Sequence, residues 1–309
     1  MIETYLDDAA PARRANALGS FDGVHLGHRR VNEATMAAAR DAGVRSSVVT
    51  FQPHPMAVLR PEIAPHELSS PARRARLIAQ LGPDELVVIP FTHEFSLLDY
   101  DAFAERVLAE RLGAVTVSVG RNFRYGHRAQ GTIETLAASG EALGFGVVAA
   151  PLLEMDGAPV SSSRIRDLIA AGDVAHAAQL LGRPPLIEGV VVRGDGRGRG
   201  LGFPTANLET ASRSALPATG IYAGRAHLAD GSHAAAVSVG YNPTFSDDRR
   251  RVRVEAYLLD FDRDIYGQRM ELELMRRLRG EERFGSVDEL VAQMHHDVDG
   301  VRAEPSVWR

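Results

Sequence analysis

Short, continuously apolar runs alternate with longer helical patterns through the first half of the chain. Five of these runs are rich in β-branched residues and predict strands, namely ANALGSF, SSVVTF, ELVVIPF, VTVSVG and FGVVAA. Between them, SPARRARLIAQLG predicts a helix with Ser70 as its N-cap, Pro71 in its first turn and Gly82 at its end. Strands that are apolar throughout belong to sheets buried on both faces, so this half predicts an α/β domain with a parallel sheet.

Strict alternation of polar and apolar residues replaces this pattern from about Leu186 onward. In RVRVEAYLL, one face carries Val252, Val254, Ala256 and Leu258, and the other carries Arg253, Glu255, Tyr257 and Leu259. RMELELM alternates in the same way, and Gly and Pro residues separate these strands closely. The second half therefore predicts an antiparallel β domain, in the form of a small barrel.

One helix is expected after the barrel, over SVDELVAQMHHDV. Ser286 and Glu289 have the spacing of a capping box at its start. An apolar stripe at helical spacing is formed by Val287, Leu290, Val291 and Met294.

The length of 309 residues fits two domains of roughly 150 residues each. We place the linker at GRPPL, which gives a first domain of residues 1–183 and a second domain of residues 184–309. Hydrophobic residues make up 45% of the chain and charged residues 24%, which is typical of a globular protein with buried cores.

Net charge and missing residue types exclude several kinds of chemistry. The net charge of -5 argues against a nucleic-acid partner held by bulk charge. The chain has no cysteine, which excludes disulfides and thiolate sites and suits a reducing compartment. All 35 basic residues are arginine, so a Walker-type P-loop and Schiff-base chemistry are excluded, because both need lysine. Phosphate chemistry must therefore use arginine, histidine, backbone N–H groups or a metal ion.

The N-terminal segment MIETYLDDAA is acidic and lacks the basic start and apolar stretch of a signal peptide. Apolar runs such as VVAAPLL are far shorter than the roughly 20 residues that a membrane helix needs. We therefore expect a cytoplasmic protein with no membrane partner.

The segment SFDGVHLGHRR places two histidines three residues apart, where the first strand gives way to a helix. Gly19 and Gly23 permit a tight turn against a ligand, and the helix expected from Leu26 offers N–H groups and a positive dipole end to phosphate. We expect His25 and His28 to bind polyphosphate oxygens and to stabilise charge on a leaving pyrophosphate. Two alternatives stay open at this point: histidines with a structural role at a helix start, and a metal site that lacks its third ligand.

A second candidate anion site lies in VSSSRIRDLI. Three serines precede a helix that carries Arg164 and Arg166, and hydroxyl, backbone N–H and guanidinium groups bind anions together. Taken alone, the serines are equally well explained as an ordinary N-cap. TFQPHP and VGRNFRYG each follow an apolar strand, so both map to the same carboxyl edge of the sheet as the histidines.

The β half opens on RGDGRGRGLGFPTANLE. Its Gly-rich part is able to wrap phosphates, and Thr205 and Asn207 offer oxygens to Mg²⁺ or a nucleotide. Two other interpretations of the Arg/Gly run are a disordered nucleic-acid-binding segment and a plain flexible loop. Glu255 lies on a later strand, on the face opposite the valines. A carboxylate there is usually solvated, but it suits the general base that phosphorylation of an alcohol requires.

Together these motifs resemble the bifunctional bacterial riboflavin kinase/FMN adenylyltransferase (FAD synthetase) family. GSFDGVHLGH, TFQPHP, VGRNFRYG and VSSSRIR follow one another as in its adenylyltransferase half, which itself resembles nucleotidyltransferases with HxGH-type motifs. GFPTAN, SVGYNPTF, VEAYLLDFDRDIYG and LRGEERFGSVDELVAQMHHD are similar to its riboflavin kinase half. The resemblance covers nearly the whole chain. It implies a nucleotidyltransferase-like, Rossmann-like α/β domain with a parallel sheet, followed by a small antiparallel β-barrel domain with a C-terminal helix.

The resemblance also implies roles for individual residues. Glu255 matches the catalytic base of the kinase half, and His25 and His28 match the catalytic histidines of adenylyl transfer. Thr205 and Asn207 are the implied Mg²⁺ ligands. The implied nucleotide-binding residues are Gly19, Ser20, Phe21, Asp22, Gly23, His25, His28, Asn122, Ser162, Ser163, Arg166, Gly202, Pro204, Thr205 and Asn207.

Three positions depart from what is common in the family. Relatives often have Asp where this chain has Asn122, and Thr where it has Ser163, and both changes keep hydrogen-bonding ability. Relatives often have His two residues after the base, where this chain has Tyr257. That change puts any role of the His in doubt, but not the base.

The function implied by the resemblance is phosphorylation of riboflavin by ATP to give FMN, followed by adenylylation of FMN to FAD with release of pyrophosphate. Riboflavin, FMN and ATP are the implied partners, Mg²⁺ accompanies ATP, and the flavins are substrates and products. Neither nucleic acid nor membrane is implied, and the sequence does not determine the oligomeric state. Two rival hypotheses are an adenylyltransferase for a different phosphorylated acceptor, which forms no FMN, and a flavin- or nucleic-acid-binding regulator without ATP turnover.

Overall fold

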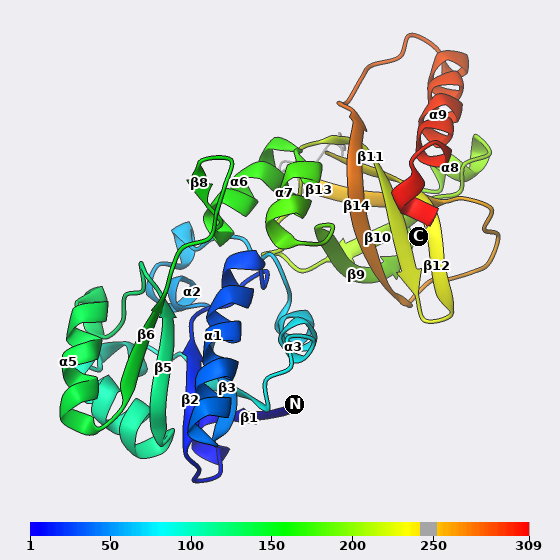
Figure 1. Ribbon diagram of the computed structural model, residues 1–309. Helices are drawn as coiled ribbons and strands as arrows, with labels where there is room; N and C mark the ends of the chain where they lie inside the picture. The colour runs from blue at the N-terminus through cyan, green and yellow to red at the C-terminus, as the bar shows by residue number, and fades with distance from the viewer. Residues whose placement is uncertain (242–251, 309) are drawn as a thin grey trace. The chain divides into compact units, whose positions relative to one another are not determined.

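The computed structural model describes residues 1–241 and 252–308 of the chain (Figure 1). The end of the SVGYNPTF motif, residues 242–245, lies outside the described residues. Within the described residues, no helix combines the length and the apolar composition that crossing a membrane requires.

Contacts between Cα atoms divide the chain into two compact units. The first unit comprises Met1–Pro65 with Ser69–Ser162, and the second comprises His66–Leu68 with Ser163–Arg309. This division falls before the expected linker, and a domain boundary between residues 183 and 184 stays a prediction.

Six parallel strands form the sheet of the first unit, in the order β1-β4-β3-β2-β5-β6. Their bounds are β1 Ile2–Tyr5, β2 Arg14–Leu18, β3 Arg45–Gln52, β4 Glu85–Pro90, β5 Ala114–Gly120 and β6 Gly146–Ala150. The five apolar runs are thus confirmed as strands, and their parallel pairing is confirmed with them. The sequence does not predict β1, because this strand has four mostly exposed residues and pairs with β4 at the edge of the sheet.

Helices cover both faces of this sheet. α1 (Leu26–Ala42) and α3 (Pro71–Ala79) pack on one face, and the π-helix η4 (Phe103–Arg111) and α5 (Ile133–Leu143) pack on the other. Adjacent residues of β3 enter opposite layers, since Val48 packs with α1 and α3 and Val49 packs with η4 and α5. Both valines are fully buried, which explains why these strands are continuous apolar runs in the sequence.

The predicted helix after the second apolar run is confirmed as α3. Ser70 caps it, because its Oγ accepts a hydrogen bond from the backbone N of Arg73 at 3.2 Å. Pro71 occupies the first turn, and Gly82 follows the last turn with a φ of 82°. The shorter elements of this part of the chain are η1 Leu6–Asp8, α2 Pro55–Leu59, η2 Pro61–Ile63, η3 Phe95–Leu97, α4 Tyr100–Ala102, η5 His127–Ala129, β7 Glu154–Met155 and β8 Ala158–Pro159.

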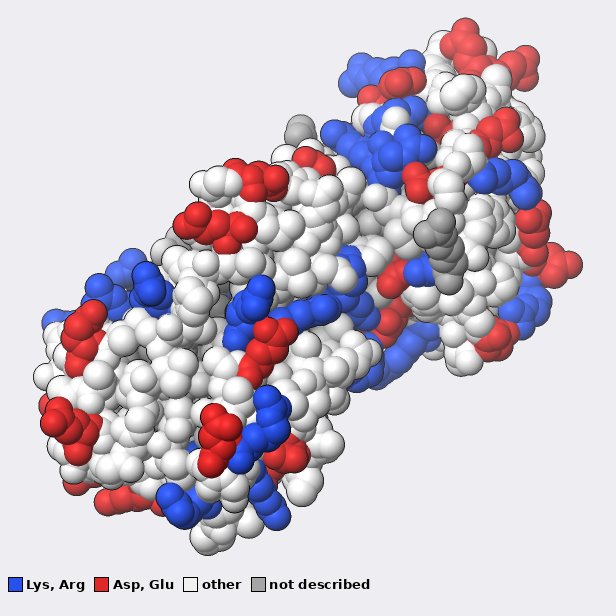
Figure 2. Space-filling view, in the orientation of Figure 1, with Lys and Arg blue, Asp and Glu red and all other residues white. Residues whose placement is uncertain are grey.

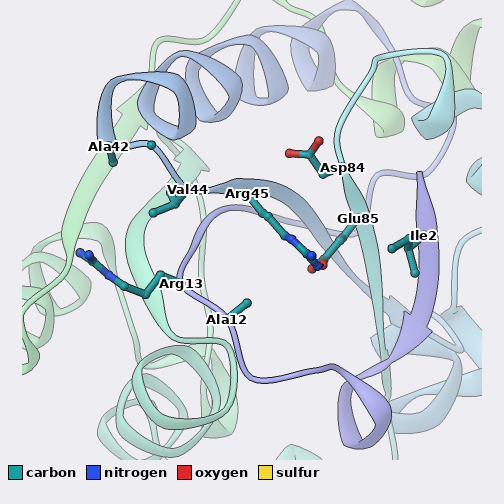
Figure 3. A pocket seen from close by; sticks show the side chains of 9 residues that line it. Ile2, Ala12, Arg13, Ala42, Val44, Arg45, Asp84 and Glu85 are labelled. Carbon is teal, nitrogen blue, oxygen red and sulfur yellow. The ribbon is translucent and has the colours of Figure 1, made fainter.

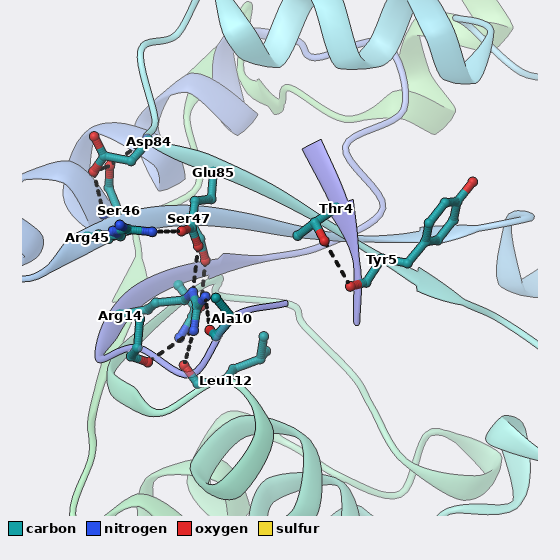
Figure 4. A network of polar contacts seen from close by, with 12 residues as sticks. Thr4, Tyr5, Ala10, Arg14, Arg45, Ser46, Ser47, Asp84, Glu85 and Leu112 are labelled. Atoms are coloured by element: carbon teal, nitrogen blue, oxygen red, sulfur yellow. Dashed lines mark hydrogen bonds and ion pairs between the residues drawn. The ribbon is translucent and has the colours of Figure 1, made fainter. Parts of the chain in front are cut away.

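An ion network with a buried centre joins the amino ends of three neighbouring strands (Figure 4). The carboxylate of Glu85, which is 3% exposed, accepts from Arg14 Nε at 2.6 Å and from Arg45 Nη1 at 2.5 Å. Arg14 is 1% exposed and also donates to three backbone oxygens. Burial by itself raises the pKa of Glu85, but the hydrogen bonds and charges of the two arginines outweigh it and hold that pKa below its ordinary value of 4.5.

A cavity of about 640 Å³ opens at this same amino edge (Figure 3). Arg13, Arg45, Asp84 and Glu85 supply its charged lining, and Arg45 points toward Glu85. These charged groups form ion pairs with one another or hydrogen bonds with nearby backbone. Arg45 pairs with Glu85, and Asp84 Oδ2 accepts a hydrogen bond from the backbone N of Ser46 at 2.8 Å. None of the predicted site residues lines this cavity, so we interpret its ion network as structural.

Replacing Glu85 by Gln is expected to lower the free energy of unfolding of the first unit by about 3–5 kcal/mol, because Arg14 then stays buried without its counter-ion. Because the folded-state pKa of Glu85 is lowered, its contribution is fully present above about pH 4.5 and is lost as the pH falls through the folded-state pKa. The difference between wild type and variant should therefore shrink below pH 4.5. Urea unfolding, followed by hydrogen exchange of β3 and β4 at neutral and acidic pH, measures both effects.

Glu33 supplies a matched control for this variant. Its ion pair with Arg30 spans 3.8 Å on the surface of α1, with the side chains 62% and 64% exposed. Replacing Glu33 by Gln should change stability by less than about 0.5 kcal/mol. Equally small effects at both positions, or a difference at Glu85 that does not depend on pH, would contradict the assigned role.

Six strands of the second unit close into an antiparallel barrel in the order β10-β13-β12-β11-β14-β9, so the predicted barrel is confirmed. Their bounds are β9 Leu186–Val192, β10 Ala206–Thr210, β11 Gly220–Leu228, β12 Gly231–Tyr241, β13 Val252–Leu258 and β14 Arg269–Arg279. Alternate residues of each strand fill the interior, among them Val254, Ala256 and Leu258 of β13. Two helices come before the barrel in sequence, α6 (Ser162–Ala171) and α7 (Val174–Leu181), and α7 packs on β14.

The C-terminal helix α9 (Val287–Arg302) forms as predicted and docks on the barrel through its second half. Val301 joins an apolar cluster outside the barrel, together with Val307 of the terminal 3₁₀ turn η6 (Pro305–Trp308). Asp297, 6% exposed, accepts hydrogen bonds from Arg279 of β14 at 2.9 and 2.7 Å. This two-point pair joins helix and barrel.

The predicted start of α9 differs from the structure in two respects. Val287 is 61% exposed, because the docking contacts lie in the later turns. The rest of the predicted stripe is only half-buried: Leu290, Val291 and Met294. The capping box is half present, since Ser286 Oγ accepts from Glu289 N at 3.2 Å, whereas Glu289 Oε2 accepts from Gly285 N at 2.8 Å. Glycine permits this, because a Cβ at position 285 would lie 3.3 Å from that carboxylate oxygen.

Candidate functional site

The predicted site of the first unit lies at a switch point of the parallel sheet. β2 has β3 on one side and β5 on the other, and such a point leaves a crevice at the carboxyl ends of the strands. The loop of residues 19–25 and the start of α1 follow β2 at this edge. TFQPHP begins within the last three residues of β3 and continues beyond the strand, and RNFRYG follows β5, so all three motifs lie at one edge of the sheet.

His25 and His28 stand at the start of α1 with stacked rings, whose centroids are 3.6 Å apart. His25 is 5% exposed and is the N-cap of the helix, where its Nδ1 accepts from the backbone N of His28 at 3.3 Å. The structural alternative is thus present, and it uses one ring nitrogen of His25. Gly27 makes room for the pair, because a Cβ there would lie 3.0 Å from His25 Cε1 and 3.3 Å from Val160 O. A phosphate at this helix start meets backbone N–H groups and imidazoles together.

The loop that leads into α1 has an uncommon backbone conformation. Phe21, Gly23 and Val24 have φ values of 50°, 77° and 41°. Residues other than glycine rarely adopt positive φ, and such residues cluster at ligand sites. The loop is held from outside, since Thr50 Oγ1 donates to Ser20 O at 3.0 Å.

Buried polar contacts fix the same loop at two further points. Asp22 is 2% exposed and its Oδ1 accepts from the backbone N of Ser69 at 3.2 Å. Ser162 Oγ donates to the backbone oxygen of Asp22 at 2.9 Å, and Gly19 N donates to Val49 O at 3.2 Å. These contacts position the loop, and a direct contact of Asp22 or Ser162 with nucleotide stays a prediction.

The remaining predicted residues of adenylyl transfer have more exposed surroundings. Asn122 is exposed and is the second residue after β5. Ser163 is exposed in the first turn of α6, and Arg166 of the same helix donates from Nε to the backbone oxygen of His66 at 2.6 Å. Their roles toward phosphate stay predictions.

Sequence reasoning misses an aromatic cluster at the carboxyl ends of β3, β4 and β5. The ring of Phe91 contacts those of Phe51 and Phe95, each at 5.8 Å between centroids. Phe123 stacks on Tyr125 at 5.8 Å and 11°. Phe91, Phe95 and Phe123 are half-buried and pack against the core on this side of the sheet. The aromatic residues in ELVVIPF and VGRNFRYG are the signal in the sequence that could have found this cluster.

The predicted site of the second unit lies on the outer face of the barrel. Asn207 of β10, Glu255 of β13 and Ser238 of β12 stand opposite one another in register, so their side chains form a row. Thr205, directly before β10, donates from Oγ1 to Glu255 Oε2 at 3.2 Å. The prediction that Glu255 faces away from the valine core is confirmed. The structure also adds Ser238, which sequence reasoning missed.

The Gly-rich loop lies over the outer face of β13, where three pairs hold it. These pairs are Arg253 with Asp195 (Nη1 to Oδ2, 2.9 Å), Glu255 with Thr205 (3.2 Å) and Tyr257 with Phe203 (ring centroids 5.2 Å apart). Successive outward-facing residues of the strand thus each contact one residue of the loop. Phe203 is 5% exposed and lies between the exposed residues Gly202 and Pro204, so the loop is anchored by its aromatic ring.

Two glycines allow the loop to approach the site residues. A Cβ on Gly194 would lie 2.2 Å from Asn207 Nδ2, and one on Gly198 would lie 2.3 Å from the backbone oxygen of Phe203. Gly198 sits in the single turn α8 (Arg197–Gly200). A side chain at either position would displace its neighbour, so both approaches require glycine.

A cavity of about 270 Å³ lies between the loop and the strands. Its lining includes the predicted residues Thr205, Asn207 and Glu255, which the structure brings together. It also includes Arg253 and Glu281, which sequence reasoning did not select. Among the described residues, no group of three or more His, Cys, Asp or Glu side chains is placed to hold a metal ion. An ion at this cavity would rely on hydroxyl and amide oxygens and on its substrate.

Two family models match the chain, one in each half. FAD synthetase matches residues 7–164 and Riboflavin kinase matches residues 181–304. The bifunctional riboflavin kinase/FMN adenylyltransferase of Listeria monocytogenes serovar 1/2a is 36% identical over 96% of this chain and 94% of its own length. The protein of the same name from Bacillus subtilis strain 168 is 35% identical over 93% of this chain and 90% of its own length.

A solved structure shares the whole architecture. The crystal structure of a protein described as a macrolide-efflux protein from Streptococcus pneumoniae is 31% identical and matches with a TM-score of 0.88. The match covers 98% of this chain and 100% of that one. The sheet, the barrel and the C-terminal helix therefore occur together in another protein.

Proposed function

This chain belongs to the bifunctional riboflavin kinase/FMN adenylyltransferase family, and from that premise we propose how its residues carry out the two reactions. The protein is a transferase with two activities. As a riboflavin kinase it moves the γ-phosphoryl group of ATP to riboflavin, which gives FMN and ADP. As an FMN adenylyltransferase it joins the adenylyl group of a second ATP to FMN, which gives FAD and pyrophosphate.

Riboflavin phosphorylation is assigned to the barrel, with Glu255 as the general base. The observation that carries this assignment is the row of Asn207, Glu255 and Ser238, in which the carboxylate also accepts from Thr205 at 3.2 Å. Glu255 takes the proton of the ribityl 5′-hydroxyl while that oxygen forms a bond to the γ-phosphorus. The bond from the γ-phosphorus to the bridging oxygen breaks, and ADP leaves. Gly202 and Pro204, the exposed loop residues on either side of Phe203, are proposed to bind the nucleotide together with Thr205 and Asn207.

Thr205 and Asn207 fit the Mg²⁺ that accompanies ATP. A hydroxyl and an amide oxygen are hard donors, and Mg²⁺ at nucleotide sites takes one or two protein oxygens beside the phosphates and water. Both side chains line the same cavity as Glu255, which suits an ion shared with the substrate. When bound, Mg²⁺ neutralises charge that develops on the β- and γ-phosphates.

Adenylyl transfer is assigned to the start of α1 in the first unit. An oxygen of the FMN phosphate attacks the α-phosphorus of ATP, and the bond to pyrophosphate breaks. No general base is needed, because a phosphate monoester is already anionic near pH 7. His25, His28 and the helix N–H groups stabilise the charge on the leaving pyrophosphate. The residues proposed to bind the nucleotide with them are Gly19, Ser20, Phe21, Asp22, Gly23, Asn122, Ser162, Ser163 and Arg166.

FMN also brings a planar isoalloxazine ring to the carboxyl edge of the sheet. The half-buried rings of Phe91, Phe95 and Phe123 are proposed to contact it. Aromatic faces in offset or edge contact add stabilisation beyond the buried area alone.

Cellular setting and organisation are part of the same proposal. A cytoplasmic location is supported by the use of ATP in both steps and by a chain without cysteine. The net charge of -5 supports the absence of a nucleic-acid partner. A domain boundary between residues 183 and 184 is supported by the riboflavin kinase match, which begins at residue 181.

One incubation tests the proposed function directly. Pure protein with riboflavin, ATP and Mg²⁺ should form FMN first and FAD later, with one ADP and one pyrophosphate for each FAD. Chromatographic separation of the four products provides the measurement. Absence of FMN, with adenylylation of some other phosphorylated acceptor, would contradict the kinase assignment. Absence of ATP turnover, with salt-sensitive binding to RNA, would contradict both assignments.

A further inference from the structure

The charges of the described residues around the barrel cavity are unbalanced for a nucleotide site. Among the described residues that line it, Asp195, Glu255 and Glu281 are acidic and Arg253 is the one basic residue. ATP carries about four negative charges at neutral pH, and bound Mg²⁺ cancels two of them. The chain has no lysine to supply further charge. Of the described residues in this lining, Arg253 is therefore the group that is able to attract the remaining charge of the triphosphate.

The position of Arg253 suits that task. It lies on β13 two residues before Glu255, and both side chains project from the outer face of the strand. Its neighbour on β12 is Gly240, which has no side chain to cover it. The space over Gly240 holds a carboxylate, because a Cβ there would lie 2.6 Å from Glu281 Oε1. Arg253 thus stands at the open, acidic side of the cavity, next to the proposed base.

The present partner of Arg253 is easily exchanged. Its Nη1 pairs with Asp195 Oδ2 at 2.9 Å, and the two side chains are 35% and 41% exposed. An ion pair that is exposed to water to this degree contributes little stability. A phosphate can therefore displace Asp195 from Arg253 at a small cost in free energy. Another arginine of the loop is placed differently, since Arg193 lies over the ring of Tyr266 at 5.3 Å. The carboxylate of Asp195 therefore occupies the position next to Arg253 that a phosphate would take.

We propose that Arg253 binds the β- and γ-phosphates of ATP in the riboflavin kinase reaction, and that it leaves Asp195 to do so. The inference rests on the proposed kinase site of Thr205, Asn207 and Glu255. A guanidinium offers two parallel N–H donors to phosphate oxygens and stays charged at any pH of interest. Asp195 holds the guanidinium toward the cavity before the nucleotide arrives and competes with the phosphate for it.

Steady-state kinetics of three variants test the proposal in the full chain. Arg253→Gln should raise the KM for ATP in FMN formation about 10- to 100-fold. This is the effect expected when hydrogen bonds to a charged group are lost. Arg253→Lys should raise it less, because charge is kept and the planar fork is lost. Asp195→Asn should lower the KM for ATP, because the carboxylate that competes with phosphate is gone. The KM for riboflavin should stay within about twofold in each variant.

Two controls separate phosphate binding by Arg253 from a general effect of losing a surface charge or of misfolding. Arg263→Gln removes another exposed ion pair of the barrel, Arg263 with Asp230, and should leave the KM for ATP unchanged. The KM for riboflavin in each preparation reports that the barrel is folded, and the FMN-to-FAD rate reports that the first unit is intact.

Three results would overturn the proposal. An unchanged KM for ATP in Arg253→Gln shows that the residue does not bind phosphate. Equal increases in Arg253→Gln and Asp195→Asn show that the pair only holds the loop. An Arg253→Gln variant in which the KM for riboflavin rises as much as the KM for ATP shows that the substitution disturbs the barrel as a whole and not phosphate binding. Failure of the wild-type protein to make FMN is a different result, and it contradicts the proposed kinase function itself.

Discussion

Protein with Glu255 replaced by Gln should form almost no FMN from riboflavin and ATP, yet should convert added FMN to FAD at the wild-type rate. The amide keeps the size of the carboxylate and can still accept from Thr205 Oγ1, which lies 3.2 Å from Glu255 Oε2. It cannot take the proton of the 5′-hydroxyl. Loss of a general base lowers kcat by about 10²- to 10⁴-fold, and the KM for ATP should change little. Product chromatography in two parallel assays, one started from riboflavin and one from FMN, measures both activities.

Glu209 provides the matched control for this variant. It lies on β10 two residues after Asn207, where it is exposed on the outer face of the barrel. Glu209→Gln removes one negative charge from the same face and should leave both activities unchanged. Wild-type FMN formation by Glu255→Gln would show that another group is the base. Loss of both activities would point instead to a misfolded chain, which circular dichroism and the FMN-to-FAD assay detect.

Replacing His28 by Ala should have the opposite effect on the two reactions. Its imidazole lies 3.6 Å from that of His25 at the start of α1, where the leaving pyrophosphate is proposed to sit. Removing one donor from such a site lowers the rate by about 10²- to 10³-fold. FAD formation from FMN should fall by this amount, while FMN formation from riboflavin should continue. FMN should therefore accumulate when riboflavin and ATP are supplied together.

His93 offers a control in the same unit, because it is an exposed histidine after β4 and is not part of the proposed site. His93→Ala should make FAD at the wild-type rate. Retention of that rate by His28→Ala as well would remove the histidine from the mechanism. A loss of helix α1, visible as faster hydrogen exchange of its amides, would assign the effect to structure instead.

The sequence predicts most of the architecture because burial leaves periodic traces. Val48 and Val49 are adjacent and both fully buried, which occurs where a strand has a packed layer on each side. The buried residues Val254 and Ala256 are separated by Glu255, which faces outward. This alternation is typical of a strand with one packed face. The edge strand β1 shows neither a continuous apolar run nor an alternating pattern, because its four residues are mostly exposed.

The candidate sites are predictable to a different depth. His25 and His28 are close in sequence, so the spacing alone places them in one helical turn. Glu255 and Thr205 are separated by fifty residues, and their contact depends on the register of β10 against β13. Nothing local in the sequence specifies that register, which is why only the resemblance to a family brought them together.

The buried charges of the first unit are unpredictable for a related reason. Arg14 and Glu85 stand at the starts of strands, where a polar residue normally indicates a turn in water. Their burial, at 1% and 3% exposure, follows from the order of the strands in the sheet. The order is a property of the whole unit, and no short segment encodes it.

The outer face of β13 carries a constraint on how this protein can change over evolutionary time. The outward-facing residues Arg253, Glu255 and Tyr257 each contact one residue of the loop. The intervening residues Val254 and Ala256 point into the barrel interior. A deletion or insertion of one residue in this strand would exchange the two sets, exposing the valine and burying the carboxylate. Point substitutions alter one contact at a time and leave the others in phase. We therefore expect this strand to accumulate point substitutions but no insertions or deletions. The spacing between the three residues that contact the loop should stay constant.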